Sequence, residues 1–199
     1  MVRDAMLAAS GLLSRKVGGP SVFPLQPEGI WNNPYNDDRW QTSAGEDRYR
    51  RSLYTFVRRT SPPPAMTAFD APSREVCTLR RPRTNTPLQA LTTLNDEAFF
   101  EAARALAKRI INEAPADPRS RAAQAFRITT SRRPRAEEVK RVIALYEAEI
   151  TRFTRDVKAA KALLNDYATA LDDSQSAEMA AWTMVANVLL NLDESLTKE

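Results

Sequence analysis

Histidine is absent from this sequence, and cysteine occurs only once. The missing imidazole excludes a Ser-His-Asp or Cys-His nucleophile and the usual zinc and facial-triad iron sites. A single cysteine excludes an internal disulfide and a c-type haem attachment. No apolar run approaches the roughly 18 residues of a membrane-spanning helix, and the opening segment lacks the net positive charge of a signal peptide. We therefore expect no cofactor, no metal site and no membrane span.

Glycine and proline are scarce in the second part of the chain. All five glycines lie within the first 45 residues, and ten of the thirteen prolines lie within the first 88. We predict one mainly α-helical domain over residues 1–199. In it, a helical bundle over about residues 86–199 follows a Pro/Arg-rich, largely irregular part over residues 1–85 that admits a short β-ribbon. A chain of 199 residues can bury a core without a disulfide or metal.

The first part is predicted to begin with a helix that continues to residues 18–20, because residues 6–13 follow helical spacing and Gly-Gly-Pro cannot continue a helix. Met1 lies inside this pattern with no capping residue before it, so we expect the chain to be a fragment of a larger protein. Residues 52–57 are rich in strand formers and are interpreted as a short strand, although they also suit one face of a helix. Residues 61–64 are predicted to be extended, polyproline-like backbone.

Helix start signals recur in the second part. Thr86 precedes Pro87 and is followed by Gln89, which is the pattern of a capping box with proline at the first helical position. Asp117 and Asp156 are predicted to cap two later helices. The helical part therefore consists of several separate helices.

Three apolar stripes follow helical spacing in this part. The first includes Leu88 and Leu91 and continues to Ile110. The other two advance by alternating steps of three and four residues, which predicts two helices that pack as neighbours in a bundle. The acidic residues 172–176 between them are predicted to form a loop. These two stripes consist of Val139, Ile143, Tyr146, Ile150, Phe153 and Val157, and of Trp182, Val185, Leu189, Leu192 and Leu196.

Positive charge is concentrated in the first part, although the net charge of the whole chain is only +4. Residues 48–83 contain nine arginines, no lysine, and only Asp70 and Glu75 as acidic residues. Guanidinium groups favour fixed, bidentate contacts with carboxylates, sulfates or phosphates. The candidate ligand-binding residues are Arg50, Arg51, Arg58, Arg59, Arg74, Arg80 and Arg81.

Two interpretations of this arginine-rich stretch stay open. YRRSLYTFVRR interleaves aromatic and cationic residues, as a surface for polyanions or stacked bases would. The same arginines also suit a structural role, in which guanidinium groups bind backbone carbonyls of a proline-rich loop that has few regular hydrogen bonds. The structural role is the commoner one, because the net charge is small and no nucleic-acid motif is present.

Other candidate sites are weaker. Two of seven loop carboxylates could form a catalytic pair for glycoside hydrolysis, but the sequence does not show that any two of them lie close together. Asp37 and Asp38 could contribute to a calcium site, although their spacing matches no EF-hand loop. Residues 17–21 resemble a phosphate loop but lack its Gly-Lys ending, so a helix stop is the simpler interpretation. Cys77 is predicted to be buried beside Val76 and Leu79. The loop carboxylates are Glu28, Asp37, Asp38, Glu46, Asp47, Asp70 and Glu75, and the loop aromatics predicted to hold residues 20–45 on a core are Phe23, Trp31, Tyr35 and Trp40.

Several blocks of this sequence together resemble a known family. The segments GGPSV, YRRSLYTF, RTSPPP, FDAPSREVC, TNTPLQALTTLND and NLDESLTKE are similar, in order and spacing, to the C-terminal region of proteins that carry domain of unknown function 1553, found in planctomycetes and related bacteria. The resemblance implies an extracytoplasmic parent protein, which often carries an N-terminal cytochrome c domain. It implies no catalytic residues, because that family has no established activity.

Three departures from the family pattern matter. In the family, further residues precede the segment that begins at Arg3 here. The haem-bearing domain of the family does not occur in this sequence, so a redox role would belong to the parent protein. Glu97 stands where the family often has proline. Arg135 stands where it often has a small hydroxyl residue, so we expect a weaker cap before Ala136.

We expect a non-catalytic interaction module. Its expected partners are the upstream domains of its parent and an acidic polysaccharide or partner domain that binds the arginine-rich surface. The alternative is part of a polysaccharide-degrading or redox enzyme that uses loop carboxylates or upstream domains. Nucleic-acid binding is a third, less favoured class, because it requires a continuous basic face.

Overall fold

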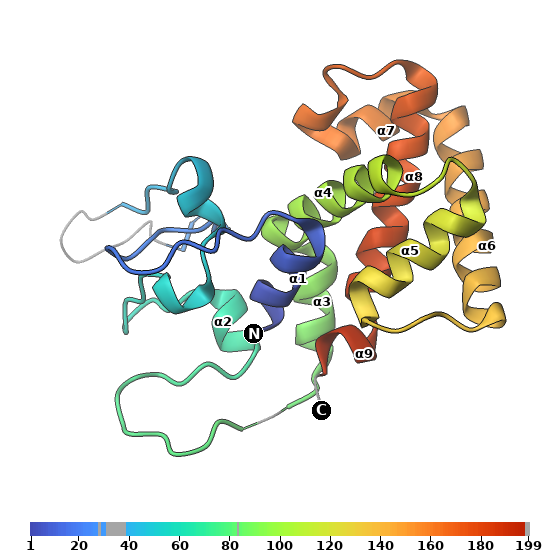
Figure 1. Cartoon of the computed structure of the whole chain (residues 1–199). Helices are drawn as coiled ribbons and strands as arrows, with labels where there is room; N and C mark the ends of the chain where they lie inside the picture. Colours follow the sequence, from blue (N-terminus) through green and yellow to red (C-terminus); the bar gives the residue numbers. More distant parts are fainter. Residues whose placement is uncertain (28, 31–38, 83, 198–199) are drawn as a thin grey trace. The chain divides into compact units, whose positions relative to one another are not determined.

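A computed structural model describes residues 1–27, 29–30, 39–82 and 84–197 (Figure 1). Backbone contacts group the chain into two compact units. Unit 1 contains residues 1–8 and 12–100, and unit 2 contains residues 9–11 and 101–199. The described residues are mainly helical and contain no regular β-strand, which confirms the predicted fold class. None of the described helices is long and apolar enough to cross a membrane.

The first helix, α1 (Val2–Ser10), is shorter than predicted. It ends at Gly11, whose φ of 81° lies in the left-handed region that favours glycine. The amides of Leu12 and Leu13 then both donate to the Leu7 carbonyl, which closes the helix end. The prediction that this helix continues to Gly18 was therefore wrong, because a single glycine already provides the C-terminal signal.

Extended chain follows, with short 3-10 helices η1 (Gly45–Tyr49) and η2 (Ser52–Tyr54) beside it. Residues 14–22 meet residues 50–55 only at isolated bridges, such as the Val22 amide donating to the Tyr54 carbonyl at 2.8 Å. The predicted strand at residues 52–57 is therefore wrong. A turn at residues 52–54 leaves too few consecutive extended residues for a ladder.

Two more helices belong to unit 1, α2 (Pro64–Ala68) and α3 (Pro87–Asn95). The polyproline run ends at Pro63, because Pro64 occupies the first helical position of α2. The capping box at Thr86 is confirmed, since its side chain accepts from the Gln89 amide at 3.4 Å and Gln89 accepts in return at 3.3 Å. Leu88 and Leu91, predicted to face a core, are 61% and 57% exposed.

A second helix begins directly after α3. Asp96 accepts from the Ala98 amide at 3.0 Å and caps α4 (Glu97–Glu113), and burial raises the pKa of the Asp96 carboxyl. The beginning of α4 places Phe99 against Phe69, with ring centroids 6.2 Å apart. The rest of α4 belongs to unit 2 and buries Leu106 and Ile110 completely.

Unit 2 is built around α8 (Asp173–Leu190), which packs against α5 (Pro118–Thr130), α6 (Ala136–Arg155) and α7 (Val157–Leu164) (Figure 1). Trp182 and Val185 on α8 are completely buried. Tyr146 of α6 stacks on Trp182 with ring centroids 4.5 Å apart, which confirms that the two predicted helices are neighbours. The short elements η3 (Asn165–Ala168) and α9 (Asp193–Leu196) complete the unit.

Caps in unit 2 largely follow the sequence. Asp117 accepts from the Ser120 amide and Asp156 from the Ala159 amide, each at 2.9 Å. Two boundary predictions were wrong. Residues 173–176 form the first turn of α8 instead of a loop, with Asp172 as its cap, and the stripe predicted to continue on one helix to Leu196 is divided between α8, which ends at Leu190, and α9. Arg135 occupies the N-cap position of α6, and its side chain accepts no hydrogen bond from the first turn. This agrees with the weaker cap expected from its departure from the family pattern.

Candidate functional site: an arginine-lined pocket

Arg50 is the most deeply buried of the predicted ligand-binding arginines, with 1% of its surface exposed. Its Nη2 donates to the carbonyls of Lys16, at 3.4 Å, and Gly18, and its Nη1 donates to the Pro20 carbonyl at 3.4 Å. Its guanidinium carbon lies 3.9 Å from the centre of the Tyr54 ring, a cation–π contact. Arg50 therefore has the structural role and is not accessible to a macromolecular ligand.

The Gly-Gly-Pro turn is shaped around this guanidinium. Gly18 and Gly19 have φ of 79° and 86°, conformations that other residues adopt only with strain. The Gly18 amide donates to the Tyr54 hydroxyl at 3.0 Å. Because carbonyl oxygens of this turn surround a cation, the turn has the wrong polarity for a phosphate, which supports the interpretation of residues 17–21 as a turn. The GGPSV and YRRSLYTF blocks are thus one packed structure.

The beginning of α1 also binds the segment of residues 48–52. Arg3 donates to the carbonyls of Arg50 at 2.8 Å and Arg48 at 2.9 Å. Asp4 accepts from both the amide and the hydroxyl of Ser52, each at 2.7 Å. Backbone that forms no helix or sheet leaves carbonyls and amides unpaired, and these two side chains satisfy three such groups as well as the Ser52 hydroxyl. The sequence analysis did not identify Arg3 or Asp4, because their partners are about 45 residues away in the sequence.

The remaining arginines of the stretch divide into two groups. Arg48 and Arg58 are half-buried, and each has interactions within the protein. Arg83 lies outside the described residues. Among the described residues, the others form neither an ion pair nor a side-chain hydrogen bond and are exposed. These five are Arg51, Arg59, Arg74, Arg80 and Arg81.

Two of these exposed arginines, Arg74 and Arg81, line a cavity of about 380 Å³ within unit 1. The apolar part of its lining comes from the start of α1, from η2, from α2 and from the chain around it. It includes Val2, Leu53, Met66, Phe69 and Phe99. The cavity has the size and mixed lining of a small ligand site. We call it the arginine pocket.

The loop carboxylates do not form a catalytic pair in the described part of the chain. Asp70 accepts from the amide and hydroxyl of Thr84 at 2.8–3.0 Å, which ties the two ends of the segment that carries Arg74 and Arg81. Asp47 binds Lys16 at 3.4 Å, and Glu46 accepts from a serine hydroxyl. Neither these three nor the exposed Glu75 lines the arginine pocket. Glu28, Asp37 and Asp38, and with them the calcium hypothesis, lie outside the described residues.

Two other sequence predictions concern single residues. Cys77 is exposed, and so are Val76 at 73% and Leu79 at 105%, so the prediction of a buried thiol was wrong. Residues 73–82 form no regular secondary structure and lie on the surface, where apolar neighbours cannot form a core. Of the loop aromatics predicted to hold residues 20–45 on a core, Phe23 packs edge to face on Trp40 and stacks on Phe56, each with ring centroids 5.1 Å apart, and neither Phe23 nor Trp40 is fully buried. Trp31 and Tyr35 lie outside the described residues.

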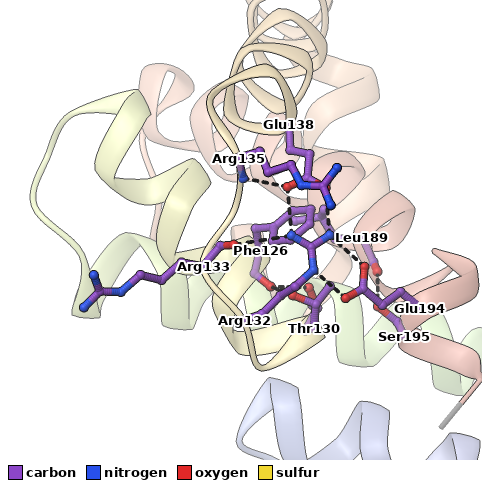
Figure 2. A network of polar contacts seen from close by, with 10 residues as sticks. Phe126, Thr130, Arg132, Arg133, Arg135, Glu138, Leu189, Glu194 and Ser195 are labelled. Atoms are coloured by element: carbon purple, nitrogen blue, oxygen red, sulfur yellow. Dashed lines mark hydrogen bonds and ion pairs between the residues drawn. The ribbon is translucent and has the colours of Figure 1, made fainter. Parts of the chain in front are cut away.

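Unit 2 has a polar network where the loop between α5 and α6 meets α9 (Figure 2). Arg132 donates from Nη2 to Glu138 at 2.7 Å and from Nε to Glu194 at 2.6 Å, and its guanidinium lies 4.7 Å from the Phe126 ring centre. Arg132 and the Arg135 amide hold the pKa of Glu138 at about 2, and Arg132 also lowers the pKa of Glu194. Both carboxylates are bound to one cation, so this network connects elements and lacks a free group for catalysis.

A second cavity, of about 660 Å³, lies in unit 2 between α4, η3 and α8. Its lining includes Lys108, Asp166 and Glu178, none of which the sequence analysis identified. Glu178 forms an ion pair with Arg121, which is 7% exposed, so this carboxylate already has a structural partner. No group of three or more metal-ligating residues is present among the described residues. The arginine pocket is therefore the stronger candidate, because two of the charged side chains in its lining, Arg74 and Arg81, have no partner among the described residues.

Comparison with known proteins identifies a family but no activity. Neither a curated protein nor a solved structure matches this chain. Residues 1–146 match the model of the family PSD1, protein of unknown function (DUF1553). This range contains all of unit 1 with the arginine pocket, and helices α4 and α5 of unit 2. Since the match extends over well more than half of the 199 residues, the chain belongs to the DUF1553 family.

Proposed function

We propose that this chain is a non-catalytic interaction module that docks upstream domains of a larger protein and binds an acidic partner through unit 1. One observation carries the proposal. Five exposed arginines of residues 48–83 have no carboxylate partner among the described residues, whereas the arginines of the same stretch that serve the fold are buried or half-buried. A guanidinium left in water at the surface can bind an external carboxylate or sulfate in bidentate geometry.

The acidic partner belongs to one of two classes, a sulfated or uronic polysaccharide or an acidic segment of another domain. The resemblance to C-terminal regions of larger extracytoplasmic proteins supports a location in the cell envelope, where both classes are present. The commitment of Asp70, Asp47 and Glu46 to local hydrogen bonds and ion pairs supports binding over catalysis.

Binding of anionic polymers tests this proposal. The purified chain is titrated with fluorescent heparin, polygalacturonate and an acidic peptide, and we expect affinity for at least one of them to fall by about tenfold between low and moderate salt. In the test variant, the five exposed arginines are replaced by glutamine, and we expect it to lose this binding. The control variant removes five exposed positive charges from unit 2, by replacing Arg119, Arg133, Lys140, Arg141 and Arg155 with glutamine.

The control should retain most of the affinity, because a directed site depends on position as well as on total charge. Equal losses of affinity in both variants would show that binding depends only on net charge, which would contradict the proposal. Tighter binding to duplex DNA than to all three probes would favour the nucleic-acid class instead.

A further inference from the structure

The polar groups that line the arginine pocket are mostly occupied. Arg3 binds two backbone carbonyls, Asp4 binds Ser52, and the Thr67 hydroxyl donates to the Pro63 carbonyl at 3.4 Å. The unpartnered charged side chains of the lining, among the described residues, are Arg74 and Arg81. A ligand of this pocket therefore meets two available guanidinium groups, a set of apolar side chains, and polar side chains that mostly have partners already.

This composition is unfavourable for a polysaccharide. Sugar hydroxyls that enter the pocket lose hydrogen bonds to water, and the lining offers few free acceptors or donors in exchange. An apolar side chain gains free energy on entering the same space, since it contacts Leu53, Met66 and Phe99 in place of water. The favoured ligand thus combines an apolar group with an adjacent anion.

The segment that carries the two arginines extends the recognition surface beyond the cavity. Residues 73–82 are all exposed, and Val76 and Leu79 lie between Arg74 and Arg81 in the sequence with 73% and 105% of their surface exposed. The succession of cationic and apolar side chains along this irregular, exposed segment suits a ligand on which acidic and apolar groups also follow one another. A polypeptide segment has that form, whereas a compact small molecule occupies the cavity alone.

We propose, on the basis of the docking function above, that the acidic partner is a polypeptide segment in which acidic residues flank an apolar side chain. The apolar side chain enters the arginine pocket, and the flanking carboxylates bind Arg74 and Arg81. Arg80 lies next to Arg81 and is equally exposed but does not line the pocket, so it contributes only long-range attraction.

Three peptide probes test this assignment with the full 199-residue chain. The first is a fluorescent, end-blocked peptide Gly-Asp-Leu-Glu-Phe-Asp-Gly. The second replaces its leucine and phenylalanine with serine, and the third replaces its acidic residues with the corresponding amides. We expect the first to bind at least about tenfold more tightly than either of the others, because the second lacks the apolar side chains and the third lacks the carboxylates. Fluorescence anisotropy measures all three affinities.

The neighbouring arginines provide a matched pair of variants. We expect Arg81→Gln and Arg74→Gln each to weaken binding of the first peptide about five- to tenfold, and Arg80→Gln to weaken it less than about twofold. Met66→Gln places a polar group in the lining. It should lower the affinity for the first peptide and leave the weak affinity for the second, serine-containing peptide unchanged. Circular dichroism and the unfolding midpoint establish that each variant is folded.

The outcomes separate this inference from the proposed function. If polygalacturonate or heparin binds tightly and the first peptide does not, the docking function stands and the polypeptide assignment is wrong. Equal effects of Arg80→Gln and Arg81→Gln, or equal binding of the first and second peptides, would also overturn the assignment. If no anionic probe binds, both proposals fail. Binding of a small apolar acid such as phenylpropionate as tightly as the first peptide would replace the polypeptide with a small-molecule ligand.

Discussion

The two units use arginine differently. In unit 2, arginines pair with carboxylates, as Arg121 does with Glu178 and Arg132 does with Glu138, and the backbone carbonyls that Arg104 and Arg109 bind lie in the last turn of a helix. In unit 1, Arg3 and Arg50 bind backbone carbonyls instead. The difference follows from secondary structure, because helices satisfy their own carbonyls whereas irregular backbone requires donors from side chains.

The comparison also explains why several arginines of unit 1 have no carboxylate partner among the described residues. Residues 1–88 contain 13 basic and 8 acidic residues, whereas residues 89–199 contain 16 and 17. Several of the described carboxylates of unit 1 bind other groups, as Asp4 binds Ser52, Asp70 binds Thr84 and Asp47 binds Lys16, so few remain for the exposed arginines. The surplus at the surface is therefore a consequence of composition, and its position beside an apolar cavity gives it a potential function.

The largest expected effect concerns the core of unit 2. Trp182→Ala removes a completely buried ring that stacks on Tyr146, and we expect it to lower the free energy of unfolding by about 3–5 kcal/mol. Val188→Ala on the same helix, where the side chain is 40% exposed, should cost less than about 1 kcal/mol. Urea unfolding monitored by circular dichroism measures both. Similar losses for the two variants would contradict the placement of α8 at the centre of unit 2.

The next effect tests the structural arginine of unit 1. Arg50→Met leaves the carbonyls of Lys16, Gly18 and Pro20 without a donor, which we expect to cost about 2–3 kcal/mol. Amide hydrogen exchange should accelerate at residues 14–22 and 50–56 and stay unchanged in α8. Arg51→Met, one residue away and exposed, serves as the control with little expected effect. Unchanged exchange in Arg50→Met would show that the guanidinium does not hold the turn.

A smaller effect depends on pH and belongs to the network of unit 2. Because the folded pKa of Glu138, about 2, lies below its ordinary value, the ionised carboxylate stabilises the folded state at pH values above that ordinary value. This contribution is lost as the pH falls towards about 2. We expect stability measured from pH 6 down to about pH 2 to decrease less steeply in Glu138→Gln than in the unaltered chain.

Glu137→Gln is the matched control for this experiment, since Glu137 is exposed and forms no ion pair within the described residues. It should retain the acid-dependent decrease. A profile for Glu138→Gln that superimposes on that of the unaltered chain would show that the ion pair with Arg132 does not form in solution.

The smallest effect concerns the start of α3 in unit 1. Thr86→Ala removes the side chain that accepts from the Gln89 amide, and we expect a loss of about 1 kcal/mol. Thr92→Ala, inside the same helix, removes only a hydroxyl that donates to its own i−4 carbonyl and should be nearly neutral. Unfolding midpoints compare the two, and an equal loss in both would indicate that the capping box does not stabilise α3.

Local signals in the sequence predicted much of the helical architecture. Thr86, Asp117 and Asp156 each cap a helix as predicted, because capping depends on residues no more than three positions apart. The apolar stripes of α6 and α8 also identified a pair of neighbouring helices, since their spacing reflects the helix period. These predictions required no knowledge of distant residues.

The candidate site was predicted only in part. The sequence drew attention to the arginines of residues 48–83, but it could not separate Arg50, which is buried, from Arg51, which is exposed. Cys77 and Leu88 were placed in a core because of their apolar character or neighbours, and both are exposed. Burial depends on which distant segments cover a residue, and spacing along the chain does not contain that information.

By itself, the sequence determined the helical class, the helix starts, the excess of arginine in the first part and the absence of imidazole chemistry. Only the tertiary structure decided which arginines hold the fold and which face solvent, and it brought Arg74 and Arg81 together with Met66 and Phe99 around one cavity. The physical reason is that propensity, capping and charge are local properties. A pocket and the pairing of buried groups depend on contacts between residues far apart in the chain.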